Sequence, residues 1–375
     1  MEASVTPWEI KGNIDYEKLL KEFGLQPLRF LPPAFQKHVL FRRGIVFAHR
    51  DFKYIAEALE QKKPFAMMTG LMPSGKFHFG HKLVADQIIF YQQLGAHVYL
   101  AVADIEAYNS RTPNMKELRD KAITEYLTNY VALGLDLKKC DFYFQSARSS
   151  DGKKANAYYR LASMLARHAT FKEFEAIYGE ISPGKMASAL LQAADMLHPQ
   201  LPEFEPQPLP VVVPVGIDQD PHVRLARDMA QRIKEWKFLP LSSTYHTFLP
   251  GLKGGKMSSS DPQSFIALTD TPEEAAMKIR KYAFSGGQAT VEEHRTKGGN
   301  PDIDVAFQML KYGLESDDKK LAKIETDYRA GKLLSGEMKQ LAIDRVVKFL
   351  REHQKKRKEA EKVVAKFLKN TCAIP

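Results

Sequence analysis

Short apolar runs alternate with segments of helical periodicity between residues 65 and 216. Val84, Ile88 and Tyr91 recur at helical spacing within residues 81–94, and Gly95 follows as a stop signal. The apolar runs are bounded by glycine, proline or polar residues and predict strands at 65–69, 97–103, 141–145 and 211–216. Strands that alternate with helices indicate a doubly wound parallel sheet, which binds ligands at the carboxyl ends of its strands.

The rest of this region is predicted to be helical. Asn114 and Glu117 resemble a capping pair that opens a helix ending at Gly134, and further helical segments fill residues 151–197. A proline-rich loop then leads to the fourth strand. Residues 1–60 have a mixed pattern, from which we expect helices and loops.

The pattern changes after about residue 262. Thr271 fits an N-cap, Pro272 the first helical position and Glu274 the third residue of a capping box. Only helices and loops are predicted from there on. We therefore expect an N-terminal extension at 1–60, a catalytic domain at 61–262 with a helical insertion at about 105–200, and a helical domain at 263–375.

Composition narrows the class of protein. The 375 residues are 44% hydrophobic and 27% charged, as in globular proteins of one or two domains. No apolar run approaches membrane-spanning length, and the first residues lack the features of a signal peptide. Cys140 and Cys372 form neither a disulfide framework nor a zinc-site spacing, so we expect a cytoplasmic protein without a structural metal.

The net charge of +10 favours a polyanionic partner, although a modest excess also serves solubility. The basic residues gather in the last predicted helix: Lys348, Arg351, Lys355, Lys356, Arg357, Lys358, Lys362, Lys366 and Lys369. This cluster is either a nucleic-acid contact or an ordinary solvated helix face.

Two histidines flank a glycine at the start of the first predicted helix, in "TGLMPSGKFHFGH". The N–H groups and dipole of a helix N-terminus favour phosphate, and Gly80 would let a nucleotide approach the backbone. His78 and His81 could then donate hydrogen bonds to phosphate oxygens. The segment matches neither the P-loop nor the G-x-G-x-x-G pattern. Taken alone, it could also be a capped loop with incidental histidines.

A second segment, "GLKGGKMSSSDP" at residues 251–262, combines mobile glycines with Lys256 and three serines. Such a loop could close over a triphosphate, or it could be a flexible linker. Its presence together with the two histidines favours a nucleotide site.

The pair "HFGH" and "KMSSS" resembles the HIGH and KMSKS signatures of class I aminoacyl-tRNA synthetases. Further segments resemble tryptophanyl-tRNA synthetase of the archaeal and eukaryotic type, and "FSGG…EEHR…GGN" is the most specific of them. They lie at residues 42–52, 215–228, 268–275, 283–307 and 342–361. The resemblance implies a Rossmann-like catalytic domain, a helical anticodon-binding domain and a homodimer.

The resemblance also implies an activity. The family activates L-tryptophan with ATP, accompanied by Mg²⁺, and transfers it to the terminal adenosine of tRNA(Trp). His78, His81, Lys256 and Ser258 take the catalytic positions. The predicted ATP-binding residues are Gly70, Ser74, His78, Gly80, His81, Asp218, Lys256, Met257, Ser258, Ser259 and Ser260. Ser259 stands where the family often has a second lysine.

The residues implied for tryptophan are Met68, Glu106, Gln192, Asp195 and Gln219. Archaeal and eukaryotic relatives usually hold the indole N–H with Tyr and Gln, and this chain has Met68 and Ala101 at those positions. "LLQAADML" instead resembles the bacterial enzyme, so Asp195 is the expected acceptor. Glu106 and Gln192 could also be ordinary surface residues.

In this family the helical domain recognises the tRNA anticodon, which suggests Lys355, Lys356, Arg357 and Lys358 as phosphate contacts. Three alternatives stay open. They are a tyrosyl-tRNA synthetase, a small-molecule nucleotidyltransferase that shares the H-x-G-H loop, and a non-catalytic RNA-binding relative.

Overall fold

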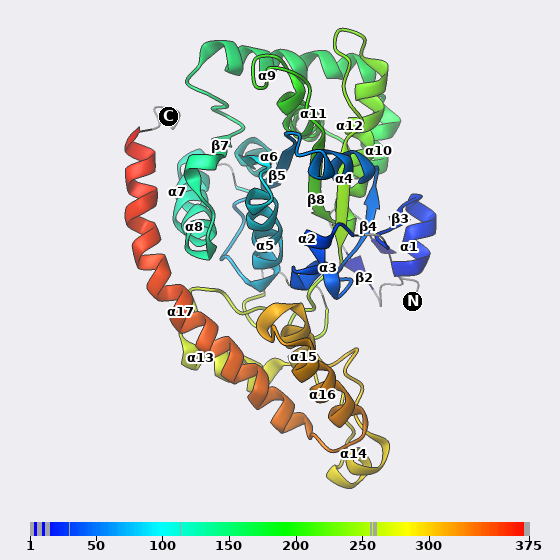
Figure 1. Cartoon of the computed structure of the whole chain (residues 1–375). Coiled ribbons are helices and arrows are strands. Elements are labelled where there is room, and N and C mark those ends of the chain that lie inside the picture. The colour runs from blue at the N-terminus through cyan, green and yellow to red at the C-terminus, as the bar shows by residue number, and fades with distance from the viewer. Residues whose placement is uncertain are drawn as a thin grey trace.

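A seven-stranded, mostly parallel β-sheet lies at the centre of the protein (Figure 1). The structure is a computed structural model that describes residues 4–5, 10–11, 16–29, 31–112, 114–255, 257 and 261–370. In spatial order the strands are β3 (Gln26–Pro27), β4 (Val46–Arg50), β9 (Ser242–His246), β8 (Val211–Gly216), β5 (Ala66–Leu71), β6 (His97–Val102) and β7 (Cys140–Phe144). The contacts of β3 and β9 with β4 are antiparallel, and the others are parallel. A separate pair joins β1 (Ser4–Val5) and β2 (Ile10–Lys11).

Helices cover both faces of the sheet (Figure 1). Those before β7 are α1 (Tyr16–Phe23), α2 (Pro33–Gln36), α3 (Val39–Arg42), α4 (Lys53–Glu60), α5 (Phe79–Gln93), α6 (Asp104–Ser110), α7 (Met115–Lys121), the π-helical η1 (Ala122–Leu127), α8 (Thr128–Leu133) and η2 (Leu137–Lys139). Those between β7 and β9 are α9 (Gly152–Leu165), η3 (Ala166–His168), α10 (Phe171–Tyr178), α11 (Pro183–Leu197), η4 (His198–Gln200), η5 (Ile217–Gln219) and α12 (Asp220–Arg232).

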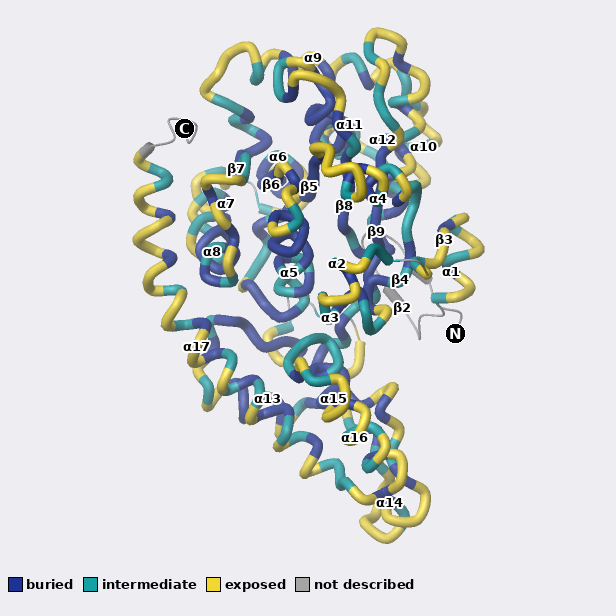
Figure 2. Tube along the Cα trace, in the orientation of Figure 1, coloured by how far each residue is buried: buried dark blue, intermediate teal, exposed yellow. Residues whose placement is uncertain are grey.

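Alternate residues of the central strands enter two different cores. On β5, Met67 packs in the core that contains α5, whereas Ala66 and Met68 pack in the core that contains α9 and α11. Because both faces are covered, these strands are apolar on both sides, and Figure 2 shows them buried in the middle of the molecule. That burial explains the continuous apolar runs from which the strands were predicted.

The direction in which successive strands are added to the sheet reverses between β5 and β8. The chain runs from β5 to β6 and then to β7 on one side, whereas β8 and β9 lie on the other side. Connections that leave two neighbouring parallel strands in opposite directions open a crevice at the carboxyl ends of those strands. The predicted doubly wound fold is therefore confirmed, with β3 and β4 added at one edge.

Two longer strands escape the sequence pattern. The prediction of only helices and loops for residues 1–60 is wrong, because β4 pairs with β9 inside the main sheet. The strand β9 reads Ser-Ser-Thr-Tyr-His and is fully buried, so it presents no hydrophobic signal. Its polar side chains are bonded to distant residues instead: Thr244 to Tyr91, and Tyr245 to Asp220.

Among the described residues after β9, the regular elements are all helices, joined by loops. It contains α13 (Pro272–Tyr282), α14 (Val291–Lys297), α15 (Val305–Met309), the π-helical η6 (Leu310–Leu314), α16 (Asp318–Arg329) and α17 (Ser335–Asn370). The predicted capping box of Thr271 and Glu274 is present. Helices α15, α16 and the start of α17 enclose a core of their own around Phe307 and Tyr328. The division of the chain into three segments stays a prediction.

The long helix α17 contacts both parts of the molecule. It starts beside α15 and α16, passes α13 and ends beside α7 and α8 (Figure 1). His353 is buried and bonded to Asn129 at 2.7 Å, and the ring of Phe349 lies 5.4 Å from that of Phe79. The described helices include none that is long and apolar enough to cross a membrane.

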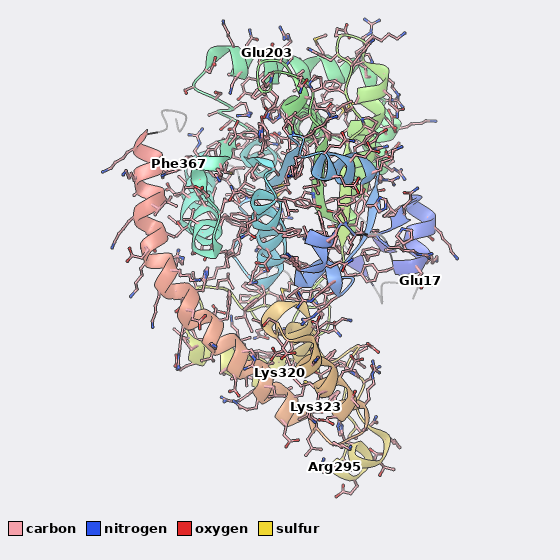
Figure 3. All side chains as sticks on the ribbon, in the orientation of Figure 1. Glu17, Glu203, Arg295, Lys320, Lys323 and Phe367 are labelled. Atoms are coloured by element: carbon pink, nitrogen blue, oxygen red, sulfur yellow. The ribbon has the colours of Figure 1, made fainter. Side chains whose placement is uncertain are left out.

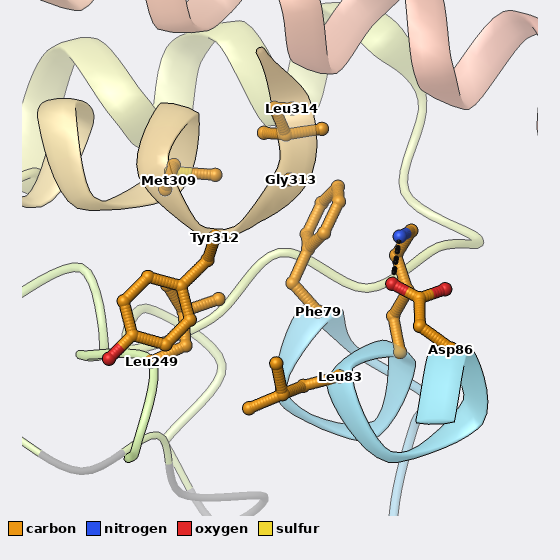
Figure 4. Close-up of a pocket in the computed structure, with 9 residues that line it drawn as sticks. Phe79, Leu83, Asp86, Leu249, Met309, Tyr312, Gly313 and Leu314 are labelled. Carbon is orange, nitrogen blue, oxygen red and sulfur yellow. Dashed lines mark hydrogen bonds and ion pairs between the residues drawn. The ribbon is translucent and has the colours of Figure 1, made fainter. Parts of the chain in front are cut away.

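A small pocket marks the junction of the two parts (Figure 4). Phe79 and Leu83 line it from α5, and Met309 and Tyr312 line it from the helical region. The Tyr312 hydroxyl lies 2.6 Å from Thr247 Oγ1 and donates to the Phe248 carbonyl at 3.1 Å. The helical region therefore holds the chain just before the 251–262 loop.

Candidate functional site

A cavity of about 330 Å³ opens where the carboxyl ends of β5 and β8 diverge. Nine residues predicted for ATP or tryptophan line it: Met68, Gly70, Ser74, His81, Glu106, Gln192, Asp195, Asp218 and Gln219. They come from segments between β5 and η5 that are far apart in the sequence. The placement expected for a doubly wound sheet is thus confirmed, whereas the role of each residue stays a prediction.

His78 and His81 close the N-terminus of α5 in a reciprocal cap. The Nδ1 atom of His78 accepts from the Gly80 amide at 3.1 Å, and that of His81 accepts from the His78 amide at 3.2 Å. The rings stack with 3.9 Å between centroids. Burial lowers the pKa of His78 to about 4 and holds that of His81 well below its usual value. Both rings are therefore neutral, with the proton on Nε2.

The two signature segments meet at Gly80. A β-carbon on Gly80 would lie 2.9 Å from His78 Cε1 and 3.5 Å from the sulfur of Met257. Because glycine has no β-carbon, the His78 ring and the Met257 side chain can both lie close to the backbone here. Nearby, the Leu268 amide donates to the Phe77 carbonyl at 2.8 Å. The predicted residues Lys256, Ser258, Ser259 and Ser260 lie outside the described part of the chain.

Glu106 and Gln192 present acceptors in the cavity that the described residues leave without a donor. The Glu106 side chain is 8% exposed, and Gln192 Oε1 is buried without a partner. Burial and the nearby Asp195 raise the pKa of Glu106 to about 7, against the opposing charge of Arg111. A ligand ammonium would satisfy both groups and balance the negative charge.

Asp195 is 2% exposed and accepts three hydrogen bonds. The donors are Tyr143 at 2.7 Å, Tyr158 at 2.8 Å and Gln145 at 2.7 Å. Burial raises the pKa of Asp195 to about 6, although these donors oppose the shift. Met68 is buried in the cavity wall, and Ala101 is buried outside it.

Asp218 and Gln219 follow β8 directly, where the sequence placed them. Gln219 donates to Asp218 at 3.3 Å. A β-carbon on Gly216 would lie 2.5 Å from Asp218 Oδ1 and 2.9 Å from the Phe248 ring. Glycine at this position therefore lets the strand end, the acidic side chain and the chain before the 251–262 loop pack together.

The four basic residues predicted to bind tRNA differ in their surroundings. Lys355, Lys356 and Lys358 are exposed, whereas Arg357 donates to the Thr124 carbonyl at 2.8 Å and pairs with Glu361. They lie on the half of α17 that packs against α8 and η1. This half of the helix is therefore in direct contact with helices of the sheet region. In Figure 3, Phe367 near the end of α17 lies far from Lys323 and Arg295 in the helical region.

Comparison with known proteins agrees with this geometry. The sequence matches the family of class I tRNA synthetases for tryptophan and tyrosine (W and Y) over residues 60–351. It is 45% identical to tryptophan–tRNA ligases of Methanocaldococcus jannaschii, with 97% of this chain and 98% of the relative covered, and of Hyperthermus butylicus, with 96% and 97% covered. The crystal structure of tryptophanyl-tRNA synthetase from Aeropyrum pernix K1 superposes with a TM-score of 0.88 at 46% identity, covering 94% of this chain and 95% of that chain.

The chain belongs to the class I tryptophanyl-tRNA synthetases. In this tryptophanyl-tRNA synthetase, five large polar or aromatic residues line the cavity that were not predicted from the sequence. They are Arg111, Tyr126, Tyr130, Gln145 and His222. Gln145 ends the third predicted strand, so the rule that ligands bind at strand ends could have identified it. Tyr126 and Tyr130 are four residues apart on one helical face, a spacing that by itself indicates only packing.

Proposed function

We propose that this protein joins L-tryptophan to ATP, forming tryptophanyl-adenylate and pyrophosphate, and transfers the aminoacyl group to the 3′-terminal adenosine of tRNA(Trp), releasing AMP. One observation carries the assignment of this chemistry to the cavity. The first turn of α5, through the neutral ring of His81, and a set of carboxylate and amide acceptors line the same cavity. The first suits a nucleotide phosphate, and the second suits an amino acid.

In this proposal the ATP half of the site is the edge formed by Gly70, Ser74, Gly80 and Asp218 with the two histidines. The Nε2–H groups of His78 and His81 donate to phosphate oxygens as negative charge shifts toward pyrophosphate. Met257 reaches Gly80, which supports closure of the 251–262 loop over the nucleotide. Lys256, Ser258, Ser259 and Ser260 are proposed as the phosphate-binding residues of that loop.

The tryptophan half consists of Met68, Glu106, Gln192, Asp195 and Gln219. Glu106, Gln192 and Gln219 hold the ammonium group, and Met68 packs on the indole ring as an apolar wall. Asp195 lies at the indole end. The substrate carboxylate attacks the α-phosphorus in line, so catalysis needs positioning and charge stabilisation and no protein nucleophile.

Mg²⁺ enters with ATP in this scheme. Among the described residues, no group of three or more histidine, cysteine, aspartate or glutamate side chains could hold a metal ion. Binding through substrate phosphates is the usual way in which enzymes of nucleotide chemistry use this ion.

We further propose that residues 263–375 bind the anticodon, that exposed lysines of α17 contact tRNA phosphates and that the protein is a cytoplasmic homodimer. The family resemblance and the exposure of Lys355, Lys356 and Lys358 support these assignments. Sedimentation equilibrium at micromolar concentration tests the oligomeric state. A monomeric mass would contradict the dimer.

ATP–pyrophosphate exchange with tryptophan and tyrosine in parallel, with and without tRNA, tests the activity. We expect exchange with tryptophan alone and charging only of tRNA(Trp). Preference for tyrosine would favour the tyrosyl alternative, and exchange with neither amino acid would contradict the proposed reaction.

A further inference from the structure

Protein donors already occupy most of the Asp195 carboxylate. Oδ1 accepts from the hydroxyls of Tyr143 and Tyr158, and Oδ2 accepts from the side-chain amide of Gln145. An ionised carboxylate offers about four acceptor positions, so these bonds leave at most one for a ligand. Asp195 is therefore better placed to hold its neighbours than to read a substrate by itself.

The bond to Asp195 also fixes the amide of Gln145. A carboxylate can only accept, so the NH₂ group of Gln145 faces Asp195 and Oε1 faces away. Gln145 is 0% exposed and lines the cavity, and its Oε1 has no hydrogen-bond partner among the described residues. A buried acceptor without a donor is unfavourable, so a ligand N–H at this position would be stabilised.

A buried cation supports this arrangement from behind. The guanidinium of Arg148 lies 3.9 Å from the centre of the Tyr143 ring and donates to His198 Nε2 at 2.8 Å. His198 Nδ1 in turn donates at 3.0 Å to the carbonyl of Ala194, the residue before Asp195. Arg148 thus links the strand that carries Tyr143 to the helix end that carries Asp195. The acceptor geometry exists before any ligand binds.

We propose that Oε1 of Gln145 accepts the indole N–H of tryptophan and that Asp195 is the positioning residue that orients it. The inference rests on the proposed function and deepens it, because it names the atom that selects an aromatic amino acid with a ring N–H. Met68 and Ala101 supply no comparable acceptor. Asp195 keeps its place in the tryptophan site, and it acts through Gln145.

The test compares tryptophan with 3-(benzothiophen-3-yl)alanine, which has sulfur in place of the ring N–H. We expect Gln145→Met to reduce the preference for tryptophan, measured as the ratio of kcat/KM values in pyrophosphate exchange, by about 10- to 100-fold. The change should lie in KM for tryptophan, with the analogue unaffected. Asp195→Asn should reduce the preference for tryptophan by a smaller factor, because the amide oxygen of Asn can still accept a hydrogen bond from Gln145.

A buried glutamine elsewhere provides the matched control. Both ends of the Gln200 amide are bonded to the backbone of Leu239, at 3.1 and 2.7 Å, and Gln200 does not line the cavity. Gln200→Met should therefore lower the melting temperature and leave the preference for tryptophan unchanged. Gln145→Asn keeps the amide but shortens the side chain, so it should also reduce the preference for tryptophan over the analogue. This second variant keeps the test valid if Gln145→Met folds poorly.

Two outcomes would overturn the inference. In the first, Asp195→Asn abolishes the preference while both Gln145 variants keep it, which would make Asp195 the direct acceptor. In the second, the Gln145 variants lose activity equally with both substrates. Failure of the proposed function is distinguishable from both, because the wild-type enzyme would then show no exchange with tryptophan.

Discussion

Among the described residues, nothing is hydrogen-bonded to the second ring nitrogen of either histidine at the start of α5. Both Nδ1 atoms accept backbone N–H groups, and burial keeps both rings neutral. The remaining Nε2–H groups are donors whose protonation does not change near neutral pH. The same bonds that cap the helix thus prepare it for an anion.

Substitutions of His81 separate the capping of α5 through Nδ1 from the donation of a hydrogen bond through Nε2–H. His81→Asn keeps an acceptor for the His78 amide but removes the distal donor, so we expect pyrophosphate exchange to fall on the order of 100-fold. His81→Gln can place an amide N–H near the position of Nε2 and should retain more activity. Equal losses in the two variants, with unchanged melting temperatures, would contradict a donor role for Nε2–H.

The two carboxyl groups predict a pH dependence for tryptophan binding. Burial raises the pKa of Glu106 to about 7 and that of Asp195 to about 6, so both become neutral as the pH falls. A neutral Glu106 no longer balances the substrate ammonium. The dissociation constant of tryptophan, measured by calorimetry, should therefore rise below pH 7 by up to about tenfold per unit. Glu106→Gln should bind weakly and lose the inflection near pH 7, and a flat wild-type profile would exclude this role.

At the scale of elements, the sequence could predict those strands whose residues are apolar because both of their faces are buried. The strands β5, β6, β7 and β8 were predicted because each is covered on both faces. The strand β9 was missed because its buried side chains are polar and bonded to distant partners. Likewise, helix starts and strand ends indicated much of the site. Gln145 was not selected, because its proposed role depends on β7, α9 and α11 meeting around Asp195.

The glycines of the "FSGG…GGN" segment belong to packing of the helical region. A β-carbon on Gly286 would lie 1.9 Å from the carbonyl oxygen of Asn300, so Gly286→Ala should lower the free energy of unfolding by about 2–4 kcal/mol. Gly336 lies in the first turn of α17 with open space around it. Gly336→Ala should raise stability by up to about 1 kcal/mol. Urea unfolding measures both, and equal effects would contradict the packing role.

At the scale of the whole molecule, α17 spans both parts of the protein. Its 36 residues correspond to about 54 Å of helix. It begins in the helical region and packs along α8, where His353 is bonded to Asn129 at 2.7 Å. A tRNA that contacts the exposed face of α17 would therefore touch an element fixed to the catalytic part.

This arrangement predicts different effects from neighbouring basic residues. Replacing Lys355, Lys356 and Lys358 together with Gln should weaken tRNA charging and spare tryptophan-dependent exchange. Each lost phosphate contact should flatten the log–log salt dependence of tRNA binding by about 0.7–0.9. Arg357→Gln should instead lower the melting temperature, because Arg357 binds Thr124 and Glu361. A wild-type salt dependence in the triple variant would mean that these lysines form only a solvated surface.

The order in which a ribosome makes the chain gives the position of α17 one further consequence. Asn129 is synthesised 224 residues before His353, its buried hydrogen-bond partner. Phe79 precedes its partner Phe349 by an even longer stretch of sequence. Until α17 emerges, the nascent catalytic region exposes the surface that this helix later covers, and such surfaces attract chaperones or other chains. This part of the fold is thus completed only after α17 has been made, when the helix packs against α8 and the start of α5, which were made long before.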